Sequence, residues 1–273
     1  MKQRLDLALL ERGLVPSRQV AQALIMSRRV TVDGRLQDKP GTRIDPDAEV
    51  AVEAPALSYV GRGGLKLAGA LDAFGIDPAG LTVLDIGAST GGFTDCALQR
   101  GAARVFAVDV GHGQIDWKLR NDPRVVVVEG LNARYLGPGD LPGLADGVDI
   151  ATIDVSFISL RLVLPKVAPM LRPPPATACI LALVKPQFEV GRGKVGRGGI
   201  VRDPELRREA LAGIAHFSLT LGLCVRGLER SPIDGAEGNV EYFACLGTGQ
   251  GGLSPEEIDD KASRLVREEP AHA

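Results

Sequence analysis

The stretch "VLDIGASTGGFTD", residues 83–95, decides the fold. It runs from an apolar strand through a glycine-rich turn into a helix. Its spacing, Gly87-x-x-x-Gly91-Gly92, differs from the G-x-G-x-x-G of dinucleotide-binding loops, and no Lys-Ser/Thr pair follows as in a P-loop. Glycines let the backbone approach a ligand closely, so the turn predicts a small-molecule site at the start of an α/β sheet.

Two carboxylates indicate which ligand this turn binds. Asp85, before the first glycine, would repel a pyrophosphate but attract the ammonium of an amino-acid ligand. Asp109 ends the next strand, "VFAVDV", where it can accept both ribose hydroxyls. We therefore predict S-adenosylmethionine as the cofactor. Its expected contacts are Asp85, Gly87, Ala88, Ser89, Thr90, Gly91, Gly92, Phe93, Asp109 and Asn132.

The rest of the sequence predicts two domains, a linker between them and a C-terminal tail. Residues 61–248 alternate strands and helices, which predicts an α/β, Rossmann-like domain with seven strands, the last two forming a hairpin. Residues 1–53 predict a small α+β domain with two helices on a curled sheet. Residues 54–60 resemble a linker, and residues 249–273 an acidic tail with a loosely held helix.

Charge is distributed unevenly along the chain. The whole protein carries a net charge of −2, but residues 1–43 hold nine Lys or Arg and four acids, a local +5 (9 − 4). A basic N-terminal module points to a polyanionic partner. The four cysteines lack C-x-x-C spacing and the three histidines are scattered, so we expect reduced core thiols in a cytoplasmic protein and no metal site. No segment resembles a signal peptide or a membrane span.

Four charged residues interrupt otherwise apolar segments. Asp154 ends "VDIATIDV", Lys185 ends "ACILALVK", Glu241 begins "EYFACL", and Lys66 lies in the helix "GRGGLKLAGALDAFG". Ligands bind outside the carboxyl ends of parallel strands, and an antiparallel last strand would begin at that same edge. We therefore expect all four side chains to converge beside the cofactor. Singly, each would more often be a structural ion pair.

Such a set can move a methyl group from a sulfonium to a ribose 2′-hydroxyl. A lysine can take the hydroxyl proton, and a carboxylate can orient that lysine. We assign the proton to Lys185, oriented by Asp154, because both end neighbouring strands. Lys66, which we expect to have more freedom on its helix, and Glu241 would hold the ribose and balance charge.

These motifs together resemble the TlyA family. The matching segments include "RGGLKL", "LDIGASTGGFTD", "IDVSFISL", "LVKPQFEVG", "GIVRDP" and "GNVEYF", and residues 1 to about 60 resemble an S4 RNA-binding domain. The family's members are bacterial ribosomal RNA 2′-O-methyltransferases, some of which carry the name hemolysin. The resemblance implies an FtsJ-like (RrmJ-like) methyltransferase domain, a Lys-Asp-Lys-Glu tetrad at the four residues above, and cytidine as the methylated nucleotide.

We expect ribosomal RNA to contact basic residues of both domains. The glycine-rich segment 189–204 directly follows Lys185 and should line the RNA path. The predicted RNA contacts are Arg4, Arg18, Arg28, Arg29, Arg62, Arg192, Lys194 and Arg197. In many S4 domains a glycine stands where this chain has Arg28-Arg29.

Three other functions fit parts of the sequence. The chain could be a non-catalytic, ribosome-associated RNA-binding protein, which the intact tetrad argues against. A membrane-lytic hemolysin is disfavoured because no strongly amphipathic, export-ready segment is present, and an NAD-dependent oxidoreductase is disfavoured by the glycine spacing. The modified nucleotide, the ribosomal subunit and the oligomeric state stay open at this level.

Overall fold

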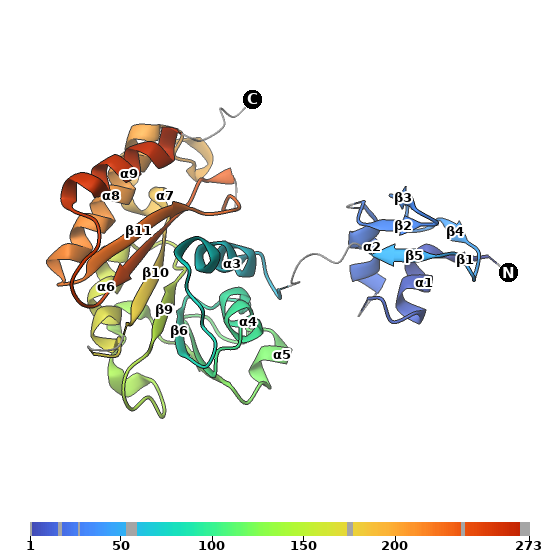
Figure 1. Ribbon diagram of the computed structural model, residues 1–273, viewed down its shortest axis with the longest axis horizontal. Helices are drawn as coiled ribbons and strands as arrows, with labels where there is room; N and C mark the ends of the chain where they lie inside the picture. The colour runs from blue at the N-terminus through green and yellow to red at the C-terminus, as the bar shows by residue number, and fades with distance from the viewer. Residues whose placement is uncertain are drawn as a thin grey trace. The chain divides into compact units, whose positions relative to one another are not determined.

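The computed structural model describes residues 2–15, 18–26, 28–52, 59–173, 177–235 and 238–267. The chain divides into two compact units, Met1–Ser58 and Tyr59–Ala273 (Figure 1). The first unit has one apolar core of its own, and the second has a core on each face of its large sheet.

The first unit packs two helices against short strands, as the sequence predicts. Buried Leu5, Leu9 and Ile25 from the helices meet Val30 from the sheet. The helices are α1 (Leu5–Glu11) and α2 (Arg18–Met26). The strands are β2 (Val30–Val32), β3 (Arg35–Gln37) and β5 (Val50–Val52), in the order β3-β2-β5, and a separate pair of β1 (Gln3–Arg4) with β4 (Arg43–Ile44).

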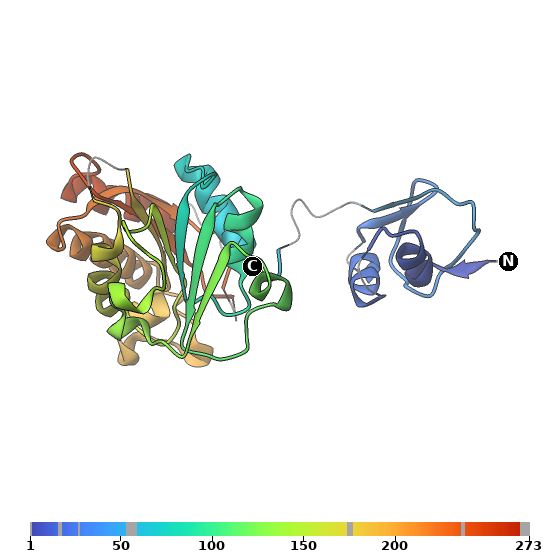
Figure 2. The same cartoon turned by 90° about the horizontal axis from the view of Figure 1, so that it is seen from below.

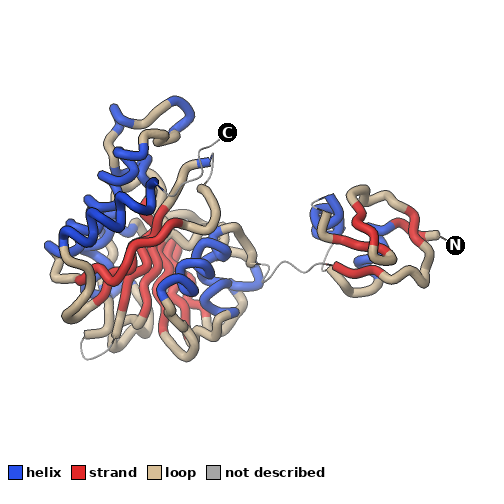
Figure 3. The backbone as a smooth tube through the Cα atoms, turned by 45° about the horizontal axis from the view of Figure 1, so that its top comes forward, coloured by secondary structure: helices blue, strands red, loops and turns tan. Residues whose placement is uncertain are grey.

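The second unit is built on one seven-stranded sheet, which confirms the predicted fold class (Figure 3). Its order is β11-β12-β10-β9-β6-β7-β8. Only β12 runs antiparallel to its neighbours, and it forms the expected hairpin with β11. The strands are β6 (Thr82–Ile86), β7 (Arg104–Asp109), β8 (Val125–Glu129), β9 (Ile150–Ile153), β10 (Cys179–Val184), β11 (Cys224–Arg230) and β12 (Tyr242–Gly247).

Helices cover both faces of this sheet (Figure 2). Apolar side chains of α3, α4 and α5 fill the core on one face, and those of α6, α8 and α9 fill the core on the other. Their bounds are α3 (Gly63–Phe74), α4 (Gly92–Gln99), α5 (Trp117–Arg120), α6 (Leu160–Val167), α8 (Pro204–Thr220) and α9 (Pro255–Arg267). The short α7 (Pro186–Glu189) directly follows Lys185.

Two segments differ from the sequence-based expectation. Tyr59, placed in the linker, packs against the core of the second unit, and its ring fills the space beside Gly64, where a Cβ would lie 2.2 Å from it. The C-terminal segment does not end in a loosely held helix, because α9 buries Ile258 and Ala262 in the core beside α8. Residues 54–58 of the linker and the tail beyond Arg267 lie outside the described residues.

Candidate active site

Strand register brings the predicted charged residues to one edge of the sheet. Asp109 ends β7, and Asp154 and Lys185 directly follow β9 and β10. Val184 pairs with Tyr242 in the antiparallel β10–β12 ladder, so the next residues along, Lys185 and Glu241, lie opposite each other. The antiparallel direction of β12 therefore puts the start of this strand beside the ends of the parallel ones, as predicted.

Lys66 and Glu241 form a buried ion pair. Nζ of Lys66 lies 2.5 Å from Oε2 of Glu241, and the two residues are 8 % and 2 % exposed. A Cβ at Gly69 on α3 would lie 2.7 Å from the ring of Pro232, so a small residue is needed there. Lys66 and Lys185 are about equally buried and each pairs with a carboxylate, so the greater freedom expected of Lys66 stays a prediction.

Lys185 and Asp154 form a second ion pair in the same place. Nζ of Lys185 lies 2.6 Å from Oδ1 of Asp154 and donates a hydrogen bond of 3.0 Å to Oγ of Ser156. Lys185 is 9 % exposed, and the Asp154 side chain is 20 % exposed. A buried lysine held by a carboxylate and a hydroxyl has a fixed direction, which general base catalysis needs.

The two pairs act on each other. Burial raises the pKa of Glu241, while the positive charges of Lys66 and Lys185 oppose that shift and Asp154 adds to it. Each of the other three residues therefore lies near enough to influence Glu241. Two cations and two carboxylates share one partly dry site, where proton positions respond strongly to a newly bound charge.

Asp85 is buried and hydrogen-bonded inside the second unit. Its carboxylate is 1 % exposed and accepts hydrogen bonds from Oγ1 of Thr94 (2.7 Å) and Oγ1 of Thr152 (3.1 Å). Burial raises its pKa to about 6. These bonds join β6 to β9 and α4 from inside, and contact of Asp85 with the cofactor stays a prediction.

Asp109 holds the same loop from its open side. Its Oδ2 accepts the N–H of Ser89 at 2.8 Å, and its Oδ1 accepts the N–H of Gly111 at 2.7 Å. Each carboxylate oxygen keeps a lone pair for a further donor. Ser89 itself has a φ of +49°, an uncommon backbone conformation for a residue other than glycine.

The remaining predicted cofactor contacts lie along this loop or near it. A Cβ at Gly87 would lie 2.3 Å from the main-chain oxygen of Asp154, so the loop passes directly over the end of β9. Ala88, Gly91, Gly92 and Phe93 are buried, and Ser89 and Thr90 are exposed. Asn132 is exposed after β8, where its Oδ1 accepts the N–H of Arg134. The small residues and the half-buried Asp109 carboxylate fit an adenosyl ligand.

Two phenylalanines at the site received no role from the sequence. Phe157 follows Asp154 by three residues and Phe188 follows Lys185 by three, and their ring centroids lie 5.2 Å apart. Phe157 is 91 % exposed and has a φ of +64°, which is unfavourable for an aromatic residue. An exposed aromatic ring held in a strained conformation beside charged groups is a common feature of binding sites. The sequence offered one indication of these phenylalanines, since each follows a tetrad residue by three positions.

The predicted RNA contacts fall into four groups. Arg4 and Arg18 are both bound to the buried carboxylate of Asp6, at 3.0 Å each. Arg62 donates to the main-chain oxygen of Asp234 at 2.8 Å, and Lys194 pairs with Glu209 at 3.1 Å. Arg28 and Arg29 are exposed, and Arg28 adopts the left-handed conformation (φ +59°) that a glycine would favour. The side chains of Arg192 and Arg197 lie outside the described part.

Neither a membrane-spanning helix nor a metal-binding cluster occurs among the described residues. No helix among them is long and apolar enough to cross a membrane. No group of three or more His, Cys, Asp or Glu within the same part of the chain could hold a metal ion.

The strand order, the glycine-rich loop after β6 and the carboxylate ending β7 define a Rossmann-like methyltransferase. The FtsJ-like methyltransferase family matches residues 59–248, and the S4 domain family matches residues 3–50. The chain is 47% identical to the 16S/23S rRNA (cytidine-2′-O)-methyltransferase TlyA of Mycobacterium tuberculosis, covering 98% of each chain. It therefore belongs to the FtsJ-like methyltransferases and, within them, to the TlyA family.

Two other relatives agree with this family. YqxC of Bacillus subtilis, named as a candidate rRNA methyltransferase, is 47% identical over 99% of this chain and 97% of its own. The solved structure of a candidate hemolysin from Streptococcus thermophilus is 41% identical, with a TM-score of 0.72 over 98% of this chain and 96% of that one. The predicted family resemblance is confirmed.

Proposed function

We propose that this protein transfers a methyl group from S-adenosylmethionine to the 2′-hydroxyl of a cytidine in ribosomal RNA, in the cytoplasm. The observation that carries the proposal is the pair of ion pairs, Lys66–Glu241 and Lys185–Asp154, at the sheet edge beside the glycine-rich loop. The name of the mycobacterial relative supports the nucleotide, and the S4 match supports RNA as substrate.

The fit of the cofactor rests on Asp109 and the loop before α4. Asp109 would accept the ribose hydroxyls with its remaining lone pairs, and the small residues 87–92 would leave the loop backbone accessible. When bound, S-adenosylmethionine supplies an electrophilic methyl group on a sulfonium. The chain itself must then align the 2′-hydroxyl and remove its proton.

Lys185 is the group that we assign to proton removal. In its neutral form, Nζ accepts the proton of the 2′-hydroxyl as the oxygen forms its new bond to the methyl carbon and the carbon–sulfur bond breaks. Asp154 then stabilises the resulting ammonium at 2.6 Å. Lys66 and Glu241 hold the ribose, and once Lys185 has taken the proton the site has two positive and two negative side chains.

Phe157 offers a surface for a base. Its exposed ring lies three residues after Asp154, and stacking of a base on an aromatic ring is worth about 1–3 kcal/mol. Stacking would hold the target nucleotide with its ribose toward the tetrad.

The test is methylation of purified ribosomal subunits with isotope-labelled S-adenosylmethionine, followed by alkaline hydrolysis. A 2′-O-methyl group blocks cleavage at its own nucleotide, so the label should remain in alkali-resistant dinucleotides that contain cytidine. Label recovered in ordinary mononucleotides would mean methylation of a base and would refute the proposal, as would the absence of label from both subunits.

A further inference from the structure

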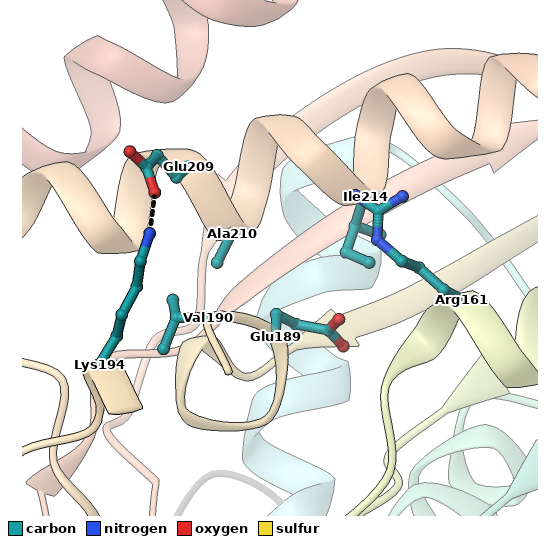
Figure 4. Close-up of a pocket in the computed structure, with 7 residues that line it drawn as sticks. All are labelled: Arg161, Glu189, Val190, Lys194, Glu209, Ala210 and Ile214. Carbon is teal, nitrogen blue, oxygen red and sulfur yellow. Dashed lines mark hydrogen bonds and ion pairs between the residues drawn. The ribbon is translucent and has the colours of Figure 1, made fainter. Parts of the chain in front are cut away.

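The chain between α7 and α8 contacts the rest of the second unit at several points, two of which differ strongly in burial. It consists of short turns over Arg192–Lys194 and Arg197–Gly199. One attachment is the ion pair of Lys194 with Glu209 on α8, drawn as a dashed line in Figure 4. Both side chains are about half exposed, and exposed pairs of this kind contribute little to stability.

The other attachment is the buried side chain of Asn239. Its Oδ1 accepts the N–H of Val201 at 3.2 Å, and its Nδ2 donates to the main-chain oxygen of Gly199 at 3.1 Å. The residue is 3 % exposed. Only one orientation of the side-chain amide makes both hydrogen bonds, because its nitrogen donates to a carbonyl and its oxygen accepts from an N–H. Val201 is also buried, so this attachment excludes water.

Asn239 belongs to the segment that holds Glu241. Its main-chain oxygen accepts the N–H of Gly235 at 2.8 Å, and the main-chain oxygen of Glu241 accepts the N–H of Ser231 at 2.9 Å. Gly235 lies against the catalytic carboxylate, since a Cβ there would be 2.2 Å from Oε1 of Glu241. A single short segment therefore contacts the loop through Asn239 and the Lys66 pair through Glu241.

We propose that Asn239 is a positioning residue that fixes the loop 196–201 to the segment carrying Glu241, and so orders the RNA-facing side of the site before RNA arrives. This inference rests on the proposed function, because it takes the loop 196–201 to face the RNA substrate. Ordering the loop in advance removes an entropy cost from binding, which strengthens association without any new contact. It also gives a structural reason for the motifs "GIVRDP" (199–204) and "GNVEYF" (238–243), which meet at this contact.

The test uses the full-length protein and trypsin, because Lys194 and Arg202 lie in or beside the loop. Asn239→Ala removes both hydrogen bonds. Asn239→Asp keeps the volume and the acceptor for Val201 but places an oxygen against the oxygen of Gly199. Glu209→Gln is the matched control, since it weakens the exposed attachment only. Each variant is digested under native conditions, and its affinity for S-adenosylmethionine and its kcat and KM on ribosomal subunits are measured.

We expect cleavage within residues 190–202 to accelerate about tenfold or more in Asn239→Ala and clearly in Asn239→Asp, with cleavage elsewhere unchanged and Glu209→Gln within about twofold of wild type. KM for the subunits should rise about tenfold, and cofactor affinity should stay within about twofold. Faster cleavage over the whole chain, or no change in the loop, would overturn the proposal. If no variant nor the wild type methylates subunits, the proposed function fails, while the digestion still decides the role of Asn239.

Discussion

Each unit of this protein buries a group of opposite charges, and the two groups behave differently. In the first unit, the fully buried carboxylate of Asp6 accepts hydrogen bonds from Arg4, Arg18 and Gln22, which hold its pKa well below the usual range. In the second unit, burial outweighs Lys66 and raises the pKa of Glu241. A carboxylate with three donors has a fixed charge, whereas a carboxylate in a partly dry group of four can exchange protons.

The two groups therefore differ in how burial and charged partners set the pKa of their carboxylates. Arg4 and Arg18 were predicted to contact RNA, yet their first partner is Asp6 inside their own domain. Lys66 and Lys185 also have carboxylate partners, but theirs lie at the ligand-binding edge of a parallel sheet. An ion pair by itself therefore says little about function. Its position in the fold indicates whether it lies where a ligand binds.

The largest expected effect concerns Lys185. Lys185→Ala should lower the single-turnover rate on ribosomal subunits by about 10²–10⁴, because it removes the general base. Affinity for S-adenosylmethionine, measured by calorimetry, should hardly change. Lys166→Ala is the control, an exposed lysine on α6. If Lys185→Ala retains nearly full rate and Lys66→Ala does not, the two lysines have been assigned the wrong roles.

Asp6 should control stability instead of catalysis. Asp6→Ala should destabilise the first unit by about 1.5–3 kcal/mol, since it removes charge-assisted hydrogen bonds. The lowered pKa means that the contribution of Asp6 is present above the unfolded value near 4 and is lost as pH falls below it. Hydrogen exchange of the amides in α1 and α2 measures the change. Asp38→Ala, which removes only an exposed partner 3.8 Å from Arg28, should have a much smaller effect.

Asp85 should show the opposite dependence on pH. Its folded pKa of about 6 lies above the unfolded value near 4, so its contribution is fully present below pH 4 and is lost as pH rises through 6. Asp85→Asn removes this loss of stability at higher pH. Relative to wild type, the variant should gain on the order of 1–3 kcal/mol between pH 4 and 7.5 in denaturant unfolding.

The control for this prediction is Asp72→Asn, because Arg100 holds the pKa of Asp72 below its usual value. That variant should lose stability relative to wild type as pH rises from about 3 to 5. Parallel trends in the two variants would show that burial does not raise the pKa of Asp85.

The smallest expected effect is at Arg28. A left-handed conformation costs a non-glycine residue about 1–2 kcal/mol, and glycine loses about 0.4–1 kcal/mol more entropy on folding. Arg28→Gly should therefore stabilise the first unit by about 0.5 kcal/mol while weakening RNA binding and reducing its dependence on salt by about one phosphate contact. Equal RNA affinity at low and high salt in the variant and the wild type would remove Arg28 from the RNA surface.

The sequence predicted the seven strands because each is a short apolar run bounded by turn residues or charges. It also placed Asp154, Lys185 and Glu241 at one edge, because strand ends are visible in the pattern. The packing of α9 was missed, although Ile258, Ala262, Leu265 and Val266 recur at helical spacing. The acid-rich composition around them obscured that apolar stripe.

What the sequence alone determined is the order of elements, the family and the identity of the four charged residues, since these depend on local patterns and motif spacing. The tertiary structure decided which charges meet. Asp85 is hydrogen-bonded to Thr94 and Thr152, and Thr152 is its direct partner across the β6–β9 ladder. Lys66 pairs with a carboxylate 175 residues away in the sequence, and Arg4 and Arg18 form ion pairs with Asp6. Such partners are set by strand register and helix packing, which act between residues far apart in the chain and leave no mark at a single position.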